Sequence, residues 1–204
     1  MTIYVIGGSP CSGKSTVAQA LSERYGLHYF KVDDHLERYM KQGAADQKAC
    51  CASAEAMSPE QIWMREPLVQ CQEELSIYEE IFPYIVEDLS KIEGAQGIIT
   101  EGAVYLPHLA KRCHLPVNRY LSITPTKEFQ VFHYRQREWV PYVLAQCSDK
   151  AKAFENWMER DVLFAKAVQQ QCHEYGYTSL INGGGQSAED LIHDVAMHFE
   201  LQQG

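Results

Sequence analysis

Residues Gly8 to Ser15 have the types and spacing that bind phosphate. This stretch matches G-x-x-x-x-G-K-[ST] in full. Its two glycines allow backbone conformations that are closed to other residues. We expect successive backbone N–H groups to point at a β-phosphate, and the positive end of the following helix to add to their field. The predicted ATP-binding set is Gly8, Ser9, Pro10, Cys11, Ser12, Gly13, Lys14, Ser15 and Thr16.

Three side chains at the end of this loop have separate predicted roles. The Lys14 ammonium is expected to bridge the β- and γ-phosphates, which makes it a catalytic candidate. The Ser15 hydroxyl is expected to bind Mg²⁺, and Thr16 lies near the α-phosphate. The predicted cofactors are therefore ATP and Mg²⁺, with ATP taken as the default triphosphate.

Carboxylates follow two of the predicted strands, where ligands of parallel sheets bind. Asp33 and Asp34 follow the second strand, and Glu101 follows the third. Phosphoryl transfer needs one carboxylate to orient or deprotonate the acceptor and another to hold Mg²⁺ or its waters. Asp33 is the catalytic candidate and Glu101 the metal candidate, and all three are candidates for substrate binding. Asp34 can instead be the N-cap of the next helix, and the same alternative is open for Asp33.

The elements that must position these residues alternate between strand and helix. Apolar runs predict strands at 3–6, 27–32, 97–100, 117–123 and 177–181. Helical patterns occupy 14–25, 35–41, 58–92, 105–113, 126–147 and 150–175, and a last helix opens at Ser187. Residues 44–57 read as a loop or a weak helix. Ser58 and Gln61 predict a capping box, and Pro67 and Pro83 predict kinks. This alternation predicts an α/β fold with a parallel sheet covered on both faces.

The phosphate loop and the strand-end carboxylates together resemble the P-loop kinase superfamily of small-molecule phosphotransferases. Glu101-Gly102 resembles the Glu-Gly of the uridine kinase and phosphoribulokinase group, and Asp33 resembles that group's catalytic Asp. Asp33 is also similar to the substrate-contacting Asp of shikimate and gluconate kinases. The resemblance covers the sheet elements across most of the chain, and it is specific for nucleotide binding. It implies a three-layer fold, with a five-stranded parallel sheet in order 2-3-1-4-5 and a helical substrate-covering insertion.

The sequence departs from that superfamily in two respects. The Asp-Gly-Phe-Pro-Arg of adenylate-type nucleotide kinases is absent. The superfamily's arginine-rich lid corresponds to about 126–150 here, where Arg135 and Arg137 are the candidates for the γ-phosphate. Residues two apart lie on different faces of a helix, so both would face the phosphates only in an irregular segment. Solvated helix charge is the alternative for each. Arg160 is a weaker candidate, since an intrahelical pair with Glu155 or Glu159 explains it as well.

Residues 44–93 lie where that superfamily covers the acceptor. Arg65 is the basic substrate-binding candidate there, beside aromatic residues that form either core or pocket wall. Ten acidic residues lie between Glu55 and Glu93, against only Arg65 and Lys91 as basic ones. This balance favours a neutral or weakly charged acceptor over a nucleoside monophosphate.

Length and composition set the remaining expectations. The 204 residues fit one domain, 1–204, and their net charge of −9 disfavours nucleic-acid binding. We expect no membrane span, no secretory signal and no structural metal. Seven cysteines, an odd number without a C-x-x-C pair, favour free thiols and a cytoplasmic location. A redox role for Cys50 and Cys51 is the alternative.

The leading hypothesis is an ATP- and Mg²⁺-dependent phosphotransferase. It would move the γ-phosphate to a small-molecule acceptor, with a hydroxyl of a nucleoside, sugar or hydroxy acid favoured. The alternative is a nucleotide-binding NTPase that acts as a switch or assembly factor through a protein partner. A nucleic-acid end kinase is disfavoured by the charge balance. The chain is expected to be a monomer or a homodimer.

Overall fold

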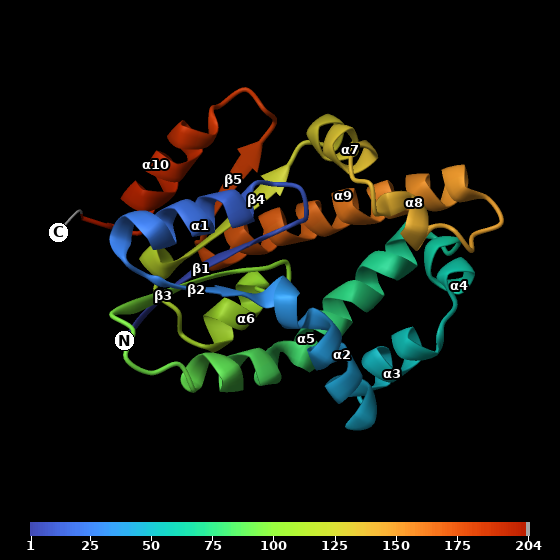
Figure 1. Ribbon diagram of the computed structural model, residues 1–204, viewed down its shortest axis with the longest axis horizontal. Helices are drawn as coiled ribbons and strands as arrows, with labels where there is room; N and C mark the ends of the chain where they lie inside the picture. The colour runs from blue at the N-terminus through green and yellow to red at the C-terminus, as the bar shows by residue number, and fades with distance from the viewer. Residues whose placement is uncertain (203–204) are drawn as a thin grey trace.

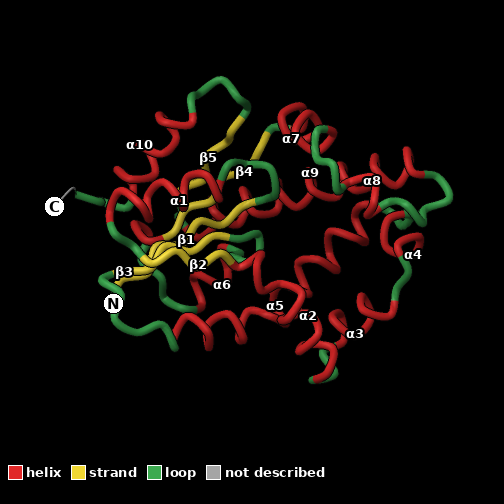
Figure 2. Tube along the Cα trace, in the orientation of Figure 1, coloured by secondary structure: helices red, strands yellow, loops and turns green. Residues whose placement is uncertain are grey.

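Five parallel strands form one sheet in the computed structural model, which describes residues 1–202 (Figure 2). The strands are β1 (Thr2–Gly8), β2 (His28–Lys31), β3 (Gly97–Glu101), β4 (Tyr120–Pro125) and β5 (Thr178–Asn182). Their order across the sheet is β2-β3-β1-β4-β5. The predicted α/β class and the order 2-3-1-4-5 are therefore confirmed.

The strand register gathers the candidate residues at one edge of the sheet. Ile6 of β1 and Lys31 of β2 both lie opposite Glu101 of β3. On the other side of β1, Gly8 lies opposite Ile123 of β4. The phosphate loop, the end of β2 and Glu101 consequently meet at the carboxyl edge.

Helices cover both faces of this sheet and extend beyond its carboxyl edge (Figure 1). The helices are α1 (Lys14–Tyr25), α2 (Leu36–Ala45), α3 (Ala49–Ala56), α4 (Pro59–Trp63), α5 (Pro67–Ser90), α6 (Pro107–Arg112), α7 (Lys127–Arg135), α8 (Val140–Val143), α9 (Lys150–Tyr175) and α10 (Ala188–His198). Two 3-10 turns are η1 (Val32–His35) and η2 (Val117–Arg119). Helices α1 and α10 lie on one face, while α5, α6 and α9 lie on the other.

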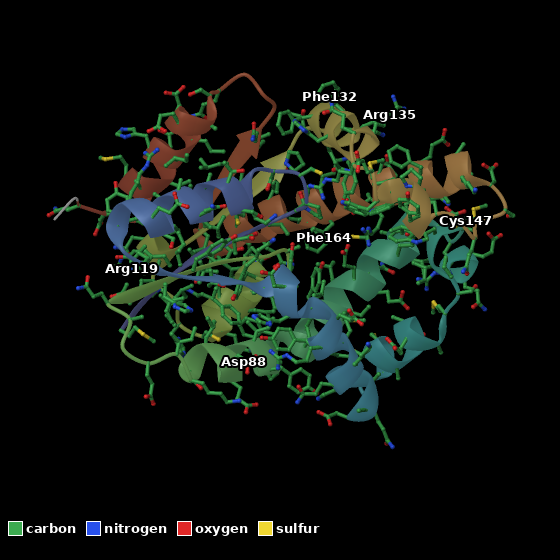
Figure 3. The ribbon with its side chains drawn as sticks, in the orientation of Figure 1. Asp88, Arg119, Phe132, Arg135, Cys147 and Phe164 are labelled. Carbon is green, nitrogen blue, oxygen red and sulfur yellow. The ribbon has the colours of Figure 1, made fainter. Side chains whose placement is uncertain are left out.

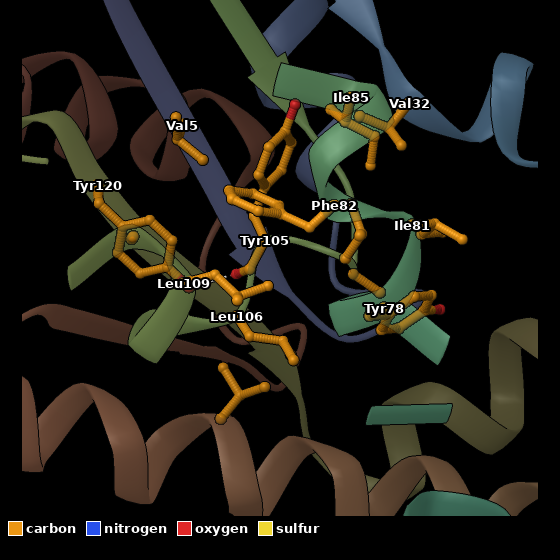
Figure 4. Packing of buried hydrophobic residues seen from close by; sticks show 14 of the residues in the cluster. Val5, Val32, Tyr78, Ile81, Phe82, Ile85, Tyr105, Leu106, Leu109 and Tyr120 are labelled. Carbon is orange, nitrogen blue, oxygen red and sulfur yellow. Dashed lines mark hydrogen bonds between the residues drawn. The ribbon is translucent and has the colours of Figure 1, made fainter. Parts of the chain in front are cut away.

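Alternating side chains of each strand supply the two cores. Val5 of β1 packs with α5 and α6, whereas its neighbour Ile6 packs with α1 and α10. Figure 4 shows Phe82 and Tyr120 around Tyr105 in the first of these cores. The Tyr120 hydroxyl donates to the Tyr105 carbonyl at 2.7 Å, so this buried polar atom is satisfied. Each such large side chain contributes about 1.5–3 kcal/mol by burial.

The chain between β2 and β3 is more helical than its sequence suggests. Residues 44–57, read as loop or weak helix, contain the end of α2 and all of α3. The predicted capping box at Ser58 is confirmed, because its side chain accepts from the Gln61 backbone and the Gln61 side chain accepts in return. Pro67 begins α5 rather than kinking a longer helix, and Pro83 lies inside α5 without ending it.

The segment after β4 is interrupted rather than continuous. The single helix predicted over 126–147 is divided into α7 and α8, and 136–139 are not helical. Arg135 is the last residue of α7, and Arg137 lies in the break. The two arginines therefore do not share one regular helix, and their directions are set separately.

None of the helices in residues 1–202 is both long and apolar enough to cross a membrane.

Candidate functional site

The phosphate loop has backbone conformations that its glycines make possible. Gly8 has φ +115° and Gly13 has φ +93°, in the region that side chains disfavour. A Cβ atom on Gly8 would also lie 1.9 Å from the Ile123 carbonyl oxygen. Gly13 is the N-cap of α1, so the loop leads directly into the positive end of that helix. This is the geometry that a phosphate cradle requires.

The Lys14 ammonium is buried inside the loop. Its Nζ donates to the Ser9 carbonyl at 2.7 Å and lies 3.5 Å from the Ser12 hydroxyl. Burial lowers the pKa of Lys14, and the carboxylates of Glu101 and Asp33 counteract this effect. The side chain is thus a desolvated cation held by neutral oxygens, beside backbone N–H groups that favour an anion.

Ser15 and Glu101 meet at the root of the loop. The Ser15 hydroxyl donates to Glu101 Oε1 at 2.9 Å, and the Tyr29 hydroxyl donates to the same oxygen at 3.0 Å. The Glu101 side chain has no exposed surface, and its Oε2 atom is buried without a hydrogen-bond partner. Hydroxyl and carboxylate oxygens are ligands that Mg²⁺ prefers. The orphaned oxygen and the adjacent hydroxyl therefore fit a magnesium ion bound directly or through water.

Tyr29 is expected to hold Glu101 in place for that ion. Burial raises the pKa of the Tyr29 hydroxyl, and Glu101 raises it further, so the hydroxyl remains a donor at neutral pH. Mg²⁺ should raise the ATP affinity of Tyr29→Phe roughly tenfold less than it raises that of the wild type. Loss of a group that orients a metal ligand has an effect of this size in other metal sites. Titration of Mg²⁺ against ATP affinity measures this. Tyr84→Phe is the matched control, because the Tyr84 hydroxyl also donates to a carboxylate, Asp46, in the segment between β2 and β3. Equal Mg²⁺ dependence in both variants would contradict the role.

Asp33 and Asp34 lie in η1, beyond the end of β2, and both are exposed. Asp34 is 3.3 Å from Lys31 in an ion pair. Neither residue caps α2, whose N-cap is His35 without a side-chain hydrogen bond, so the capping alternative is wrong. Asp33 lies two residues after Lys31, the end of β2, and therefore at the same carboxyl edge of the sheet as Glu101.

A cavity of about 610 Å³ opens from the phosphate loop. It runs between the loop, the end of α7 and the turn between β5 and α10. Its lining includes Cys11, Gly13, Thr16, Phe129, His133, Arg137, Asn182 and Gly184. The Asn182 side chain donates to the Ser12 carbonyl at 3.0 Å and so ties this wall to the loop.

The structure brings only one of the two candidate lid arginines to this cavity. Arg137 lines it, and its guanidinium carbon lies 5.2 Å from the Tyr134 ring centre and 5.4 Å from that of Trp139. Arg135 is exposed and stands on the outer side of α7 (Figure 3). The irregular segment after α7 therefore does not bring both arginines to the phosphates: Arg137, within it, lines the cavity, and Arg135, the last residue of α7, does not.

A second, smaller cavity lies beside Tyr78 and Arg160, with a volume of about 200 Å³. Arg65 lines it and forms an ion pair with Glu73 at 2.5 Å. The substrate-binding candidates thus separate: Arg65 belongs to this cavity, whereas Asp33, Asp34 and Glu101 lie at the sheet edge.

Arg160 has different partners from those its sequence suggests. The expected pair with Glu155 or Glu159 is wrong: the guanidinium lies 2.7 Å from Asp161 and 3.3 Å from Glu74 of α5. Burial opposes its charge, but Asp161 and Glu74 outweigh burial and raise the Arg160 pKa.

Sequence reasoning missed several polar residues of these sites. Asn182 lines the first cavity, and Gln70, Glu73 and Glu74 line the second. Tyr29 contacts Glu101, and Asp161 contacts Arg160. One signal was present in α9. Asp161 lies four residues after Trp157 and four before Ala165, on the apolar stripe of the helix. A carboxylate on such a stripe must find a buried partner, which here is Arg160.

One comparison with known proteins, a match to a family model, covers the phosphate loop. The family model described as "AAA domain" matches residues 3–77, which hold the phosphate loop and Asp33. No curated protein matches the chain significantly. A crystal structure described as a "putative kinase" from Chloroflexus aurantiacus matches over 97% of both chains, with 14% identity and a TM-score of 0.45. The loop, the strand order and the AAA-domain similarity together support a P-loop, nucleotide-binding α/β domain.

Proposed function

We propose that the protein is an ATP- and Mg²⁺-dependent phosphotransferase that moves the γ-phosphate to a small-molecule hydroxyl. One observation carries the proposal. An exposed carboxylate, Asp33, lies at the same sheet edge as the buried Lys14 and the Ser15–Glu101 pair. A phosphate cradle, a metal ligand set and a free base side by side are what transfer to a hydroxyl requires.

The nucleotide occupies the loop and the 610 Å³ cavity in this proposal. Residues 8–16 hold the phosphates, and the base and ribose lie between α7 and the turn after β5. Ser15 and Glu101 hold Mg²⁺, which neutralises charge on the phosphate oxygens. The sequence offers Arg135 and Arg137 for contact with the γ-phosphate; in this proposal Arg137 makes that contact, because it lines the cavity. Residues 44–93 cover the acceptor and about 126–150 form the lid, within one domain spanning 1–204.

The transfer step uses Asp33 as the base. The acceptor hydroxyl gives its proton to the Asp33 carboxylate as its oxygen bonds to the γ-phosphorus. The bond from that phosphorus to the β–γ bridging oxygen breaks, and ADP leaves with the electron pair. Lys14 stabilises the charge that develops on the bridging and γ-phosphate oxygens.

The test of this function is an ATP-consumption screen with purified protein. Neutral nucleosides, sugars and polyols, hydroxy acids, nucleoside monophosphates and cofactor precursors are offered singly with Mg²⁺. We expect at least one acceptor to raise ATP consumption well above the rate without acceptor, with a phosphorylated product detected by mass spectrometry. Steady hydrolysis that no acceptor changes would favour the NTPase switch instead.

Asp33→Asn should separate transfer from nucleotide binding. The change removes the base but leaves the loop, so transfer should fall by about 10²-fold while ATP affinity changes little. Glu37→Gln is the matched control, because Glu37 is an exposed carboxylate four residues further along the chain, paired with Lys41 on α2. Steady-state rates and calorimetric ATP titrations measure both variants. A transfer rate for Asp33→Asn equal to that of the control would remove the proposed base.

A further inference from the structure

The 200 Å³ cavity has an apolar wall and a charged wall. Its apolar lining comes from α2, α3, α4 and α5, and consists of Leu36, Met40, Ala54, Ile62 and Ile77. Its polar lining consists of Arg65, Gln70, Glu73, Glu74, Tyr78 and Arg160. The cavity adjoins the catalytic edge: Leu36, which lines it, is the first residue of α2 and lies three residues after Asp33 of η1.

Both arginines of the cavity are already neutralised. Arg65 is paired with Glu73, and the two side chains are only 25% and 19% exposed. Arg160 faces Glu74 and Asp161, and its guanidinium carbon lies 5.3 Å from the centre of the Trp63 ring. No cationic charge in this wall is left for an incoming phosphate or carboxylate. An anion entering here would instead face carboxylates that are partly desolvated, which is unfavourable.

One buried acceptor atom in this wall lacks a partner. Gln70 is 4% exposed, and its Nε2 donates to the Arg65 carbonyl at 2.8 Å and weakly to the Trp63 carbonyl. Its Oε1 atom has no hydrogen-bond partner. Buried polar atoms are nearly always satisfied, so this oxygen needs a donor such as an O–H group of a ligand. The Glu73 and Glu74 carboxylates beside it accept from the same kind of donor.

We propose that this cavity binds the acceptor and that the acceptor is uncharged: a small molecule with several hydroxyl groups and one apolar face. The inference rests on the proposed phosphotransferase function, whose acceptor it narrows. Hydroxy acids and phosphorylated acceptors are excluded, because the paired arginines offer them no free cation. Neutral sugars, polyols and nucleosides remain.

The test compares neutral probes with their anionic counterparts by calorimetric titration, with ADP and Mg²⁺ present. The pairs are ribose and ribose 5-phosphate, sorbitol and gluconate, and uridine and uridine monophosphate. We expect at least one neutral member to bind, and its anionic partner to bind at least tenfold more weakly. Tighter binding of the anionic members, or binding of no neutral member, overturns the inference.

Two variants locate the binding in this cavity. Glu73→Gln frees the Arg65 charge, so the preference for the neutral member should shrink by about tenfold. Glu87→Gln is its control, because it removes the same charge and an ion pair with Lys91 from the same helix outside the cavity. Gln70→Leu should lower the affinity for the neutral probe several-fold. Gln72→Leu is its control, because Gln72 is exposed on the same helix. An unchanged preference in Glu73→Gln, or equal affinities in the two leucine variants, overturns the assignment.

The proposed function fails separately from this inference. If a neutral probe binds but is not phosphorylated, and ATP is not consumed, the proposed phosphotransferase function is contradicted. The preference of the cavity for uncharged ligands is still supported by that binding. An anionic acceptor that is phosphorylated contradicts the inference and leaves the phosphotransferase standing.

Discussion

Lys14→Met should abolish phosphoryl transfer and leave the fold intact. The ammonium lies in the loop, 2.7 Å from the Ser9 carbonyl, where the bridging oxygen of a nucleotide would need a positive charge. Preorganised charges of this kind contribute a factor of about 10³ or more to the rate. Methionine keeps most of the buried volume and removes the charge. The transfer rate at saturating acceptor is the measurement, with ATP affinity determined by calorimetry.

The stability of this variant in the absence of nucleotide is informative. Burial lowers the pKa of Lys14, so the folded state binds this proton less readily than the unfolded chain. Between the lowered pKa and the ordinary value near 10.5, the unfolded chain therefore holds more protons, and the wild-type free energy of unfolding should rise with pH. The methionine variant should lack this rise and should be at least as stable near neutral pH.

Lys111→Ala, an exposed lysine on α6, is the control for the loss of positive charge. Transfer retained by Lys14→Met within tenfold of the wild type would contradict the proposed catalytic role. A variant that unfolds at low denaturant would show that Lys14 is structural instead.

The sheet was predictable because its information is local. Each strand is a short apolar run, and the alternation with helices leaves few topologies when crossovers are right-handed. The largest errors in the predicted helices and strands occur where tertiary contacts, rather than the local sequence, determine the secondary structure. Residues 49–56 are small and without clear period, yet they form α3, whose first backbone N–H groups donate to the Glu80 carboxylate of α5. A cap supplied from thirty residues away leaves no trace in the local sequence.

The candidate site was predictable only in part, for a similar reason. The loop residues and Asp33 lie just after strands, and Glu101 is the last residue of β3, so topology alone brings them to one edge. Tyr29 points at Glu101 from a neighbouring strand, and that contact depends on register rather than on a motif. The choice between Arg135 and Arg137 depended on where α7 ends, which helical periodicity does not determine.

The buried pairs of the smaller cavity were beyond sequence reasoning altogether. Arg160 and Glu74 are separated by 86 positions and meet because α5 and α9 pack against each other. Their charges cancel, so a count of acidic and basic residues in one segment describes this cavity poorly. The acidic excess between Glu55 and Glu93 nevertheless favoured a neutral or weakly charged acceptor, and the paired arginines are the physical basis that we propose for an uncharged one.

Arg160→Met should be the most destabilising substitution of an ionised side chain in this cavity. The Arg160 side chain is 13% exposed, and that of Asp161, which it contacts at 2.7 Å, is fully buried. Removing the cation leaves the buried Asp161 carboxylate and the partly buried Glu74 carboxylate, which both lie against it, without compensation. Loss of one partner from a buried ion pair costs roughly 3–5 kcal/mol of unfolding free energy. Denaturant unfolding followed by circular dichroism measures it.

The pH dependence of that loss identifies its cause. Burial raises the pKa values of Glu74 and Asp161 even in the presence of Arg160, and removal of the cation should raise both further. Between the ordinary carboxyl pKa and the raised values, the folded variant then holds more protons than the unfolded chain. Its stability must therefore fall as pH rises through this window, and the deficit should be largest at neutral pH and smaller near pH 5. A deficit that does not change with pH would mean that lost packing around Trp63, rather than an uncompensated buried charge, causes the loss of stability.

Two further variants separate the charge effect from the packing effect. Arg24→Met removes an equally close partner of a carboxylate, Glu189, but both side chains are exposed, so its stability should barely change. Asp161→Asn added to Arg160→Met removes one uncompensated charge, and it should recover part of the lost stability at pH 7 and little near pH 5. A double variant no more stable than Arg160→Met at pH 7 would contradict a buried-charge penalty. Recovery would show that the Arg160 charge is neutralised by Glu74 and Asp161. The proposed preference of this cavity for an uncharged acceptor depends on that neutralisation.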